Sequence, residues 1–312
     1  MSSTDLLPGA DPPVTPRLGG LPVPPIPPGQ RNLRFFLNEL RLIFFRRRNQ
    51  LLLGVVALFP LLIGIGLKVA APNSPGGGGG GPGVGGPSGA GQLFNQLAGN
   101  GVFLTFIALA LLLVLVLPLA VAVISGDSVA GEAGYGTLRY LLAVPAGRTR
   151  LLVVKYLAIV VFAVAATFIV TVVALVTGIA LFPHGPVTLL SGNTVSLTDG
   201  LWRVLLVTLY TCAAMAAVGA IGLAISTFTE HAIGAIAAIT ILVVGSEVVD
   251  QVPQFAAAGP YLPTHWWAYF DSFLRMPMDT TSIWHGLLSF AVYAGVFFLI
   301  AWARFTSADV TS

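Results

Sequence analysis

The sequence predicts an all-α membrane protein that crosses the bilayer six times. Hydrophobic residues make up 56% of the 312 residues and charged residues only 9%, a balance that does not suit a water-soluble domain of this size. Six apolar segments reach the roughly 20 residues that a helix needs to cross the hydrocarbon core. A helix in lipid satisfies its own backbone hydrogen bonds, whereas an open strand does not. The segments cover residues 51–71, 102–124, 151–181, 201–227, 232–249 and 283–303.

Basic residues indicate how the spans are oriented, because loops rich in Lys and Arg are retained in the cytoplasm. If the N-terminus lies inside, twelve of the fifteen basic residues fall on the cytoplasmic side. Lys68, Arg203 and Arg275 fall on the outer side, and we expect Arg203 to reach the lipid headgroups. Six spans then place both termini in the cytoplasm. The net charge of +3 is too small to indicate a nucleic-acid partner.

The segment before the first span divides into two parts. Residues 1–30 contain nine prolines, which oppose helix and sheet alike, and they predict a disordered cytoplasmic tail. Residues 32–48 carry apolar side chains at helical spacing on one side and basic side chains on the other, which predicts an amphipathic helix in the inner membrane interface. The alternative is a cytoplasmic extension of the first span. The apolar positions are Leu33, Phe36, Leu37, Leu40 and Phe44.

Two further segments are expected on the outer side. Residues 72–91 are almost all Gly, Pro and Ser and predict a flexible loop. Residues 252–282 combine four prolines with a cluster of aromatic residues. Because aromatic residues of this kind settle at membrane interfaces, the second segment predicts short helices on the outer leaflet before the last span.

Glu247 and Asp250 stand three residues apart on one helical face, near the outer end of the fifth span. Ionisable groups at membrane depth are candidates for function, so this pair is a candidate ion or substrate site. The alternative is a hydrated helix end. The four histidines are far apart in the sequence and the chain has a single cysteine, so we expect no metal site.

The segment between the second and third spans carries the strongest functional signal. We expect a cytoplasmic loop at residues 125–150, in which Leu138, Leu141 and Leu142 fall on one face of a short helix. The residue before Pro145 is steered away from helical angles, which ends this helix. The loop is therefore predicted to hold a short amphipathic helix between two spans, where another protein could push it.

An acidic residue in this segment is followed by Gly-Thr-Leu, by two leucines, by Pro-x-x-Arg and by a lysine at the start of the third span. These residues are Glu132, Gly136, Thr137, Leu138, Leu141, Leu142, Pro145, Arg148 and Lys155. The pattern resembles the signature loop of ABC-2-type permeases, and the resemblance identifies residues 31–312 as an ABC-2 type transmembrane domain. It implies that the loop holds a coupling helix, which docks in a groove of a separate ATP-binding subunit. The turn at residues 226–231 is expected either to form a second, smaller contact through Glu230 or to be an ordinary polar hairpin. The candidate ATPase-coupling residues are Glu132, Gly136, Thr137, Leu138, Arg139, Leu141, Leu142, Pro145, Arg148 and Glu230, and Lys155 also matches the family pattern.

The resemblance implies a permease subunit of an ATP-driven exporter in a bacterial plasma membrane. Its partners would be two copies of an ABC ATP-binding subunit, a second permease chain that is identical or related, and membrane lipid. Its cargo would be a hydrophobic or amphiphilic compound, such as a drug or a lipid. Only two lysines occur and neither follows a glycine, so the phosphate-binding Gly-Lys loop is absent. We therefore expect neither enzyme activity nor a cofactor in this chain, with ATP and Mg held by the partner.

Two other classes of function stay open. One is a stand-alone secondary transporter or channel, which would be expected to carry charged or broken helices at the membrane midplane. The other is a membrane anchor or sensor without transport activity.

Overall fold

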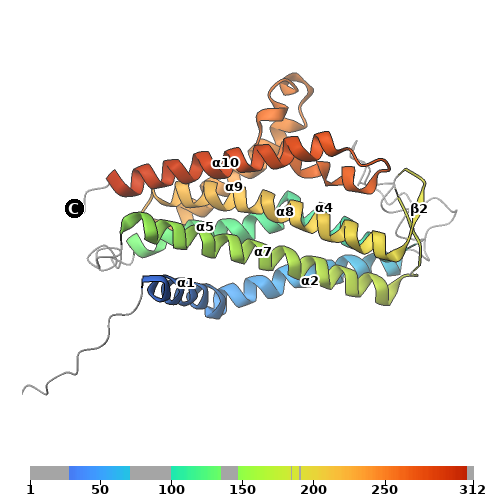
Figure 1. Cartoon of the computed structure of the whole chain (residues 1–312), viewed down its shortest axis with the longest axis horizontal. Coiled ribbons are helices and arrows are strands. Elements are labelled where there is room, and N and C mark those ends of the chain that lie inside the picture. Colours follow the sequence, from blue (N-terminus) through green and yellow to red (C-terminus); the bar gives the residue numbers. More distant parts are fainter. Residues whose placement is uncertain (1–27, 71–99, 135–146, 184, 190, 308–312) are drawn as a thin grey trace, which may run out of the picture.

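The computed structural model describes residues 28–70, 100–134, 147–183, 185–189 and 191–307. Long helices lie side by side along the molecule, and a small antiparallel hairpin with Val187 opposite Val195 lies at one end (Figure 1). In chain order the elements are α1 (Pro28–Phe45), α2 (Arg47–Ala70), α4 (Phe103–Val114), α5 (Val116–Gly134), α7 (Arg148–Leu181), β1 (Val187–Thr188), β2 (Thr194–Val195), α8 (Leu197–Ser226), α9 (Ala232–Asp250), the 3-10 helices η2 (Pro253–Phe255), η3 (Gly259–Tyr261) and η4 (His265–Leu274), and α10 (Thr280–Ser307).

Within the described residues, six helices are long and apolar enough to cross a membrane: α2, α5, α7, α8, α9 and α10. The prediction of an all-α protein with six spans is confirmed. The short apolar helix α4 precedes α5, so the second predicted span is built from both. Helices α7, α8 and α10 have 34, 30 and 28 residues, more than the roughly 20 that a perpendicular span requires.

A proline explains why the second span is broken. Leu115, between α4 and α5, has φ −142° and ψ −49°, outside the helical region. Pro118 has no N–H to donate, and its ring clashes with the carbonyl group four residues earlier, which belongs to Val114. The helix is therefore interrupted one turn before the proline. Pro60 lies inside α2, where the helix continues.

The predicted start of the loop after this span is wrong. Residues 125–134 were expected in the loop 125–150, but α5 continues to Gly134. The residues Gly126, Asp127 and Ser128 have the composition of a turn. They stay helical because long-range contacts support them, including ion pairs between Asp127 and two arginines.

Helix α1 is separate from the first span, as predicted for the interfacial helix at residues 32–48. The chain bends at Arg46, and the Asn49 side chain donates to the Ile43 carbonyl oxygen at 2.8 Å. The alternative, a continuous extension of the first span, does not fit this break. Phe35 and Ile43 pack against the bundle, while Leu33 is 58% exposed, so one side of α1 is available to lipid. Its position at the membrane interface stays a prediction.

The first helix also starts earlier than expected. Residues 28–30, assigned above to the tail, form its first turn. Proline suits a first helical position, because it has no N–H group and an N–H group there would have no partner in the helix. Residues 1–27 and the predicted Gly-rich loop 72–91 lie outside the described residues.

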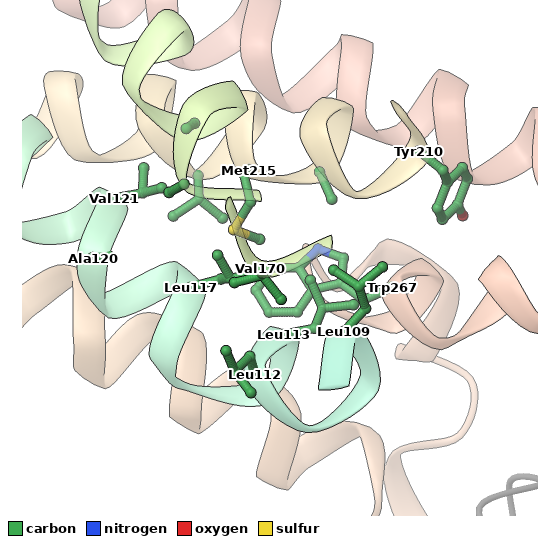
Figure 2. Close-up of a cluster of buried hydrophobic side chains, with 14 of the residues drawn as sticks. Leu109, Leu112, Leu113, Leu117, Ala120, Val121, Val170, Tyr210, Met215 and Trp267 are labelled. Carbon is green, nitrogen blue, oxygen red and sulfur yellow. The ribbon is translucent and has the colours of Figure 1, made fainter. Parts of the chain in front are cut away.

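Helix α8 lies at the centre of the bundle. In the most apolar 18-residue stretch of α8, 72% of the residues are buried, compared with 17% in the corresponding stretches of α2 and α10. Figure 2 shows Met215 of α8 close to Val170 of α7 and Leu117 of α5, with Trp267 of η4 reaching into the same cluster. The core therefore joins all of these elements through apolar contacts.

The predicted short helices before the last span are present as η2, η3 and η4. The aromatic residues of η4 do not all lie on the outside, because Trp267, Phe270 and Phe273 are buried in the bundle. Arg203 of α8 donates to the carbonyl oxygens of Phe273 and Arg275 and is 6% exposed. The expectation that Arg203 reaches the headgroups is therefore wrong, because it holds the end of η4 against α8.

Candidate functional site

The predicted coupling loop joins α5 to α7 at one end of the bundle, which we call the basic end. This end also contains α1, the start of α2 and the ends of α8 and α10 (Figure 1). The predicted residues Gly136, Thr137, Leu138, Arg139, Leu141, Leu142 and Pro145 lie outside the described residues. The basic residues that fall at this end within the described ranges are Arg31, Arg34, Arg41, Arg46, Arg47, Arg48, Arg148, Arg150, Lys155 and Arg304, whereas Lys68, Arg203 and Arg275 belong to the opposite end.

A buried ion network joins both sides of the predicted loop to α1. The Lys155 side chain is 1% exposed, and its Nζ donates to Glu132 Oε1 at 2.7 Å and to Glu39 Oε1 at 3.2 Å. These residues come from α7, α5 and α1. A buried ammonium needs compensating charge and hydrogen bonds, and two carboxylates supply both. The network therefore fixes the last turn of α5 relative to the first turns of α7.

The start of α7 is also bound to the end of α10. Arg148 Nη1 donates to the Thr306 carbonyl oxygen at 2.9 Å, and Trp302 Nε1 donates to Thr149 Oγ1 at the same distance. A helix C-terminus leaves its last carbonyl groups without partners in the helix, and a cation at that position is favourable. The structure thus brings the predicted residue Arg148 against the last span.

The end of α8 is bound to α5 by a single buried hydroxyl. Ser226 Oγ accepts from the backbone N–H groups of Val129 and Ala130, at 3.1 and 2.9 Å, and donates to the Gly126 carbonyl oxygen at 2.9 Å. Ser226 is fully buried. These bonds hold α5 helical over part of the segment that the sequence assigned to a loop.

The turn after α8 lies beside the end of α5. A Cβ atom added at Gly134 would lie 2.9 Å from the Glu230 backbone oxygen, so the close approach depends on glycine. The guanidinium of Arg304 lies 5.7 Å from the centre of the Phe228 ring in the same turn. The predicted residue Glu230 is exposed and lies next to Gly134, the last residue of α5.

A pocket of about 240 Å³ opens beside this network between α1, α2, α5 and α7, and we call it the α1 pocket. At the edge of this pocket, Asp127 Oδ2 accepts from Arg48 Nη2 at 2.6 Å and from Arg46 Nη1 at 3.1 Å. Its lining residues are Glu39, Leu42, Ile43, Arg46, Arg48, Asn49, Ile124, Asp127, Ser128, Gly131, Glu132, Lys155 and Ile159.

The candidate pair Glu247 and Asp250 lies at the opposite end of the bundle. Asp250 Oδ1 lies 2.6 Å from His265 Nδ1 of η4, and both side chains are partly buried. Nearby, the Ser246 and Thr264 hydroxyls are 2.8 Å apart. Among the described residues no group of three or more His, Cys, Asp or Glu side chains is arranged to hold a metal ion. These contacts join α9 to η4, and an ion or substrate role stays a prediction.

The comparison with protein families decides the class of the molecule. The profile described as "ABC-2 family transporter protein" matches residues 43–310, which is most of the chain and begins near the end of α1. The chain belongs to the ABC-2 transporter family. The prediction of an ABC-2 type permease is confirmed, and with its six apolar helices the ABC-2 chain is a multi-pass membrane protein of transport. A comparison with curated proteins finds none that matches.

Several residues of the ABC-2 chain's basic end were not predicted as site residues. Glu39, Asp127 and Ser226 each form a hydrogen bond with another helix. The two residues joined by these bonds are separated by 79 to 116 positions in the sequence. Glu39 interrupts an apolar and basic helix pattern, and an acidic residue in such a position was the available signal for a partner. Nothing in the sequence around Ser226 distinguishes it from the serines of ordinary helix ends.

Proposed function

We propose that this ABC-2 chain is the permease subunit of an ATP-driven exporter, moved by separate ATP-binding subunits that act on residues 135–146, which we call the coupling segment. ATP-binding subunits generally accompany permeases of this family. The observation that carries the proposal is the attachment of both sides of this segment to the bundle. Glu132, which precedes it, accepts from Lys155 of α7, and Arg148, which follows it, donates to Thr306 of α10. A force on the segment would therefore reach several spans together.

The contacts define a path for that force. From the start of α7, Lys155 leads to α1 through Glu39, and Arg148 leads to α10 through Thr306. From the end of α5, Ser226 leads to α8. Packed helices shift between discrete arrangements as rigid bodies rather than deforming continuously. Displacement of this segment would thus bias the spans between inward-open and outward-open packings.

The turn at residues 227–231 supplies a second contact for the same partner. Its proximity to Gly134 places Glu230 next to the start of the coupling segment, and Glu230 is exposed. A basic groove on the ATP-binding subunit would suit this carboxylate. The larger contact would come from Leu138, Leu141 and Leu142, which the sequence predicts to share one helical face.

The assembly would contain two permease chains, identical or related, because two ATP-binding subunits close around nucleotide as a pair. The interior of the bundle is apolar at its centre (Figure 2), which suits a hydrophobic or amphiphilic cargo. The concentration of Arg and Lys at the basic end favours a cytoplasmic location for it, with both termini inside a bacterial plasma membrane.

The experiment is co-purification with an ATP-binding protein encoded beside the gene for this chain. The tagged wild-type chain is expected to retain that protein, and Leu138→Asp is expected to lose it because a charge enters the docking face. Leu197→Asp, at the opposite end of the bundle, is the matched control and should retain it. Equal retention by Leu138→Asp, or transport by the purified chain alone, would contradict the proposal and favour a stand-alone transporter.

A further inference from the structure

The charges of the α1 pocket are arranged in two layers. At its floor, the ammonium of Lys155 is shared by the carboxylates of Glu39 and Glu132, which leaves a formal charge of −1. At its mouth, Arg46 and Arg48 share the carboxylate of Asp127, which leaves a formal charge of +1. The side chains of Glu39 and Glu132 are 16% and 25% exposed, whereas those of Arg46 and Arg48 are 54% exposed, and this difference defines floor and mouth. The Asp127 carboxylate between the two arginines is 13% exposed.

The arginines of the mouth keep hydrogen-bonding capacity for a ligand. A guanidinium carries five N–H donors, and Arg46 directs one of its nitrogen atoms to Asp127. Arg48 directs Nη2 to Asp127 and Nε to Asn49 at 3.4 Å. A phosphate is the anion that such paired guanidinium groups recognise best, because two parallel N–H groups match its oxygens.

The ligand that fits both layers is therefore a zwitterion, with its negatively charged group at the mouth and its positively charged group at the floor. We propose that the α1 pocket binds the headgroup of a phospholipid with a primary ammonium beyond its phosphate, as in phosphatidylethanolamine. Its phosphate would contact Arg46 and Arg48, and its ammonium would donate to the carboxylates of Glu39 and Glu132. Choline has no N–H group to donate, and a glycerol headgroup has no cation for the acidic floor.

The surface next to the mouth indicates that the ligand is a lipid. Leu42 lines the pocket and is 50% exposed. A stripe of exposed apolar residues continues the face of Arg48 along α2, at the three- and four-residue intervals of one helical face. An acyl chain attached to a phosphate at Arg48 would lie along it. The stripe consists of Leu51, Val55, Leu58 and Leu62, which are 71%, 50%, 48% and 54% exposed.

Native mass spectrometry of the full-length chain in detergent, with phosphatidylethanolamine, phosphatidylcholine or phosphatidylglycerol of the same acyl chains, tests the inference. Phosphatidylethanolamine should be retained at least about tenfold more strongly than the other two, as expected for one charge-assisted hydrogen bond. Arg48→Gln should weaken the retention of all three lipids, because Arg48 is proposed to contact the phosphate that they share. Arg47→Gln is the matched control, because Arg47 is exposed, neighbours Arg48 and does not line the pocket.

The floor is tested separately with the double variant Glu39→Gln and Glu132→Gln, compared with Asp199→Asn at the opposite end. The double variant should lose the discrimination between ethanolamine and choline headgroups while still binding phospholipid through the arginines. If it does not remain monodisperse, Arg48→Gln alone decides, since that side chain is largely exposed. Equal retention of the three lipids by the wild-type chain, or retention by Arg48→Gln as strong as by the wild-type chain, would overturn the inference.

A soluble zwitterion is the competing source of the same chemistry. Glycerophosphoethanolamine, which has the headgroup without acyl chains, should fail to displace the lipid when both are added at equal concentration. Displacement at equal concentration would overturn the lipid assignment. Because the test uses the chain without an ATP-binding subunit, it is independent of the proposed coupling.

Discussion

Lys155 lies almost without solvent contact between carboxylates from two other helices, and the cost of burying its ammonium is offset only while both remain bonded to it. The sequence identified Lys155 and Glu132 through their resemblance to the family loop. It did not identify Glu39, because that carboxylate is 116 residues from Lys155 and meets it only after α1 has packed against α7. Contacts of this separation follow from tertiary packing, so an acidic residue in an apolar and basic helix can signal that it has a partner but does not identify which residue that partner is.

Lys155→Met should lower the free energy of unfolding by about 2–3 kcal/mol, because two carboxylates would face each other without their cation. Denaturant titration in detergent measures this loss. The triple variant that adds Glu39→Gln and Glu132→Gln removes the repulsion and should recover most of the lost stability. A triple variant no more stable than Lys155→Met would show that the ion network is not what stabilises this end.

Ser226→Ala should destabilise the end of α5 by about 1–3 kcal/mol, because two buried N–H groups lose their acceptor. Hydrogen exchange should become faster at the amides of Val129 and Ala130 and stay unchanged in the core of α7. Ser128→Ala is the control, since Ser128 Oγ bonds only the Ser125 carbonyl oxygen of its own helix among the contacts that the structure describes. Similar exchange in both variants would contradict the bridging role of Ser226.

At the scale of the elements, hydropathy was sufficient to find the spans but not their breaks and ends. The second span shows both limits: Pro118 interrupts it at Leu115, and its helix then continues to Gly134. The proline was visible in the sequence, yet Pro60 sits in α2 without ending it, so local chemistry does not decide which proline breaks a helix. The extension of α5 depends on Ser226 and on the Asp127 ion pairs, which are supplied from other elements.

Pro118→Ala should straighten the second span, because the N–H group is restored and the ring clash is removed. Spin labels at Leu111→Cys and Ala133→Cys, in a Cys212→Ala background, report the distance across Leu115. This distance should increase in Pro118→Ala and stay the same in Pro60→Ala. No change in Pro118→Ala would mean that packing, rather than the proline, holds the break.

At the scale of the whole molecule, the distribution of charge distinguishes the two ends of the bundle. The described part of the basic end has ten Lys and Arg residues and that of the opposite end has three. Because basic residues are retained in the cytoplasm, this asymmetry predicts one orientation in the membrane. In the predicted orientation, the α1 pocket and the coupling segment would lie on the side where ATP is available.

Thiol labelling with a membrane-impermeant reagent tests this orientation in a Cys212→Ala background. Asn193→Cys, in the hairpin opposite the basic end, should react in intact cells. Thr229→Cys, in the turn next to Gly134, should react only in inverted vesicles. The reverse pattern would place the coupling segment outside the cell and would exclude an intracellular ATP-binding partner.

The measurement that tests the central claim most directly is the rate of ATP hydrolysis by the ATP-binding subunits after assembly with this chain in lipid discs. The wild-type chain should stimulate hydrolysis above the rate of the ATP-binding subunits alone. Lys155→Met should still assemble but should reduce the rate to that of the isolated subunits, because the buried ion network no longer transmits movement of the coupling segment. Full stimulation by Lys155→Met, or no stimulation by the wild-type chain, would contradict the account.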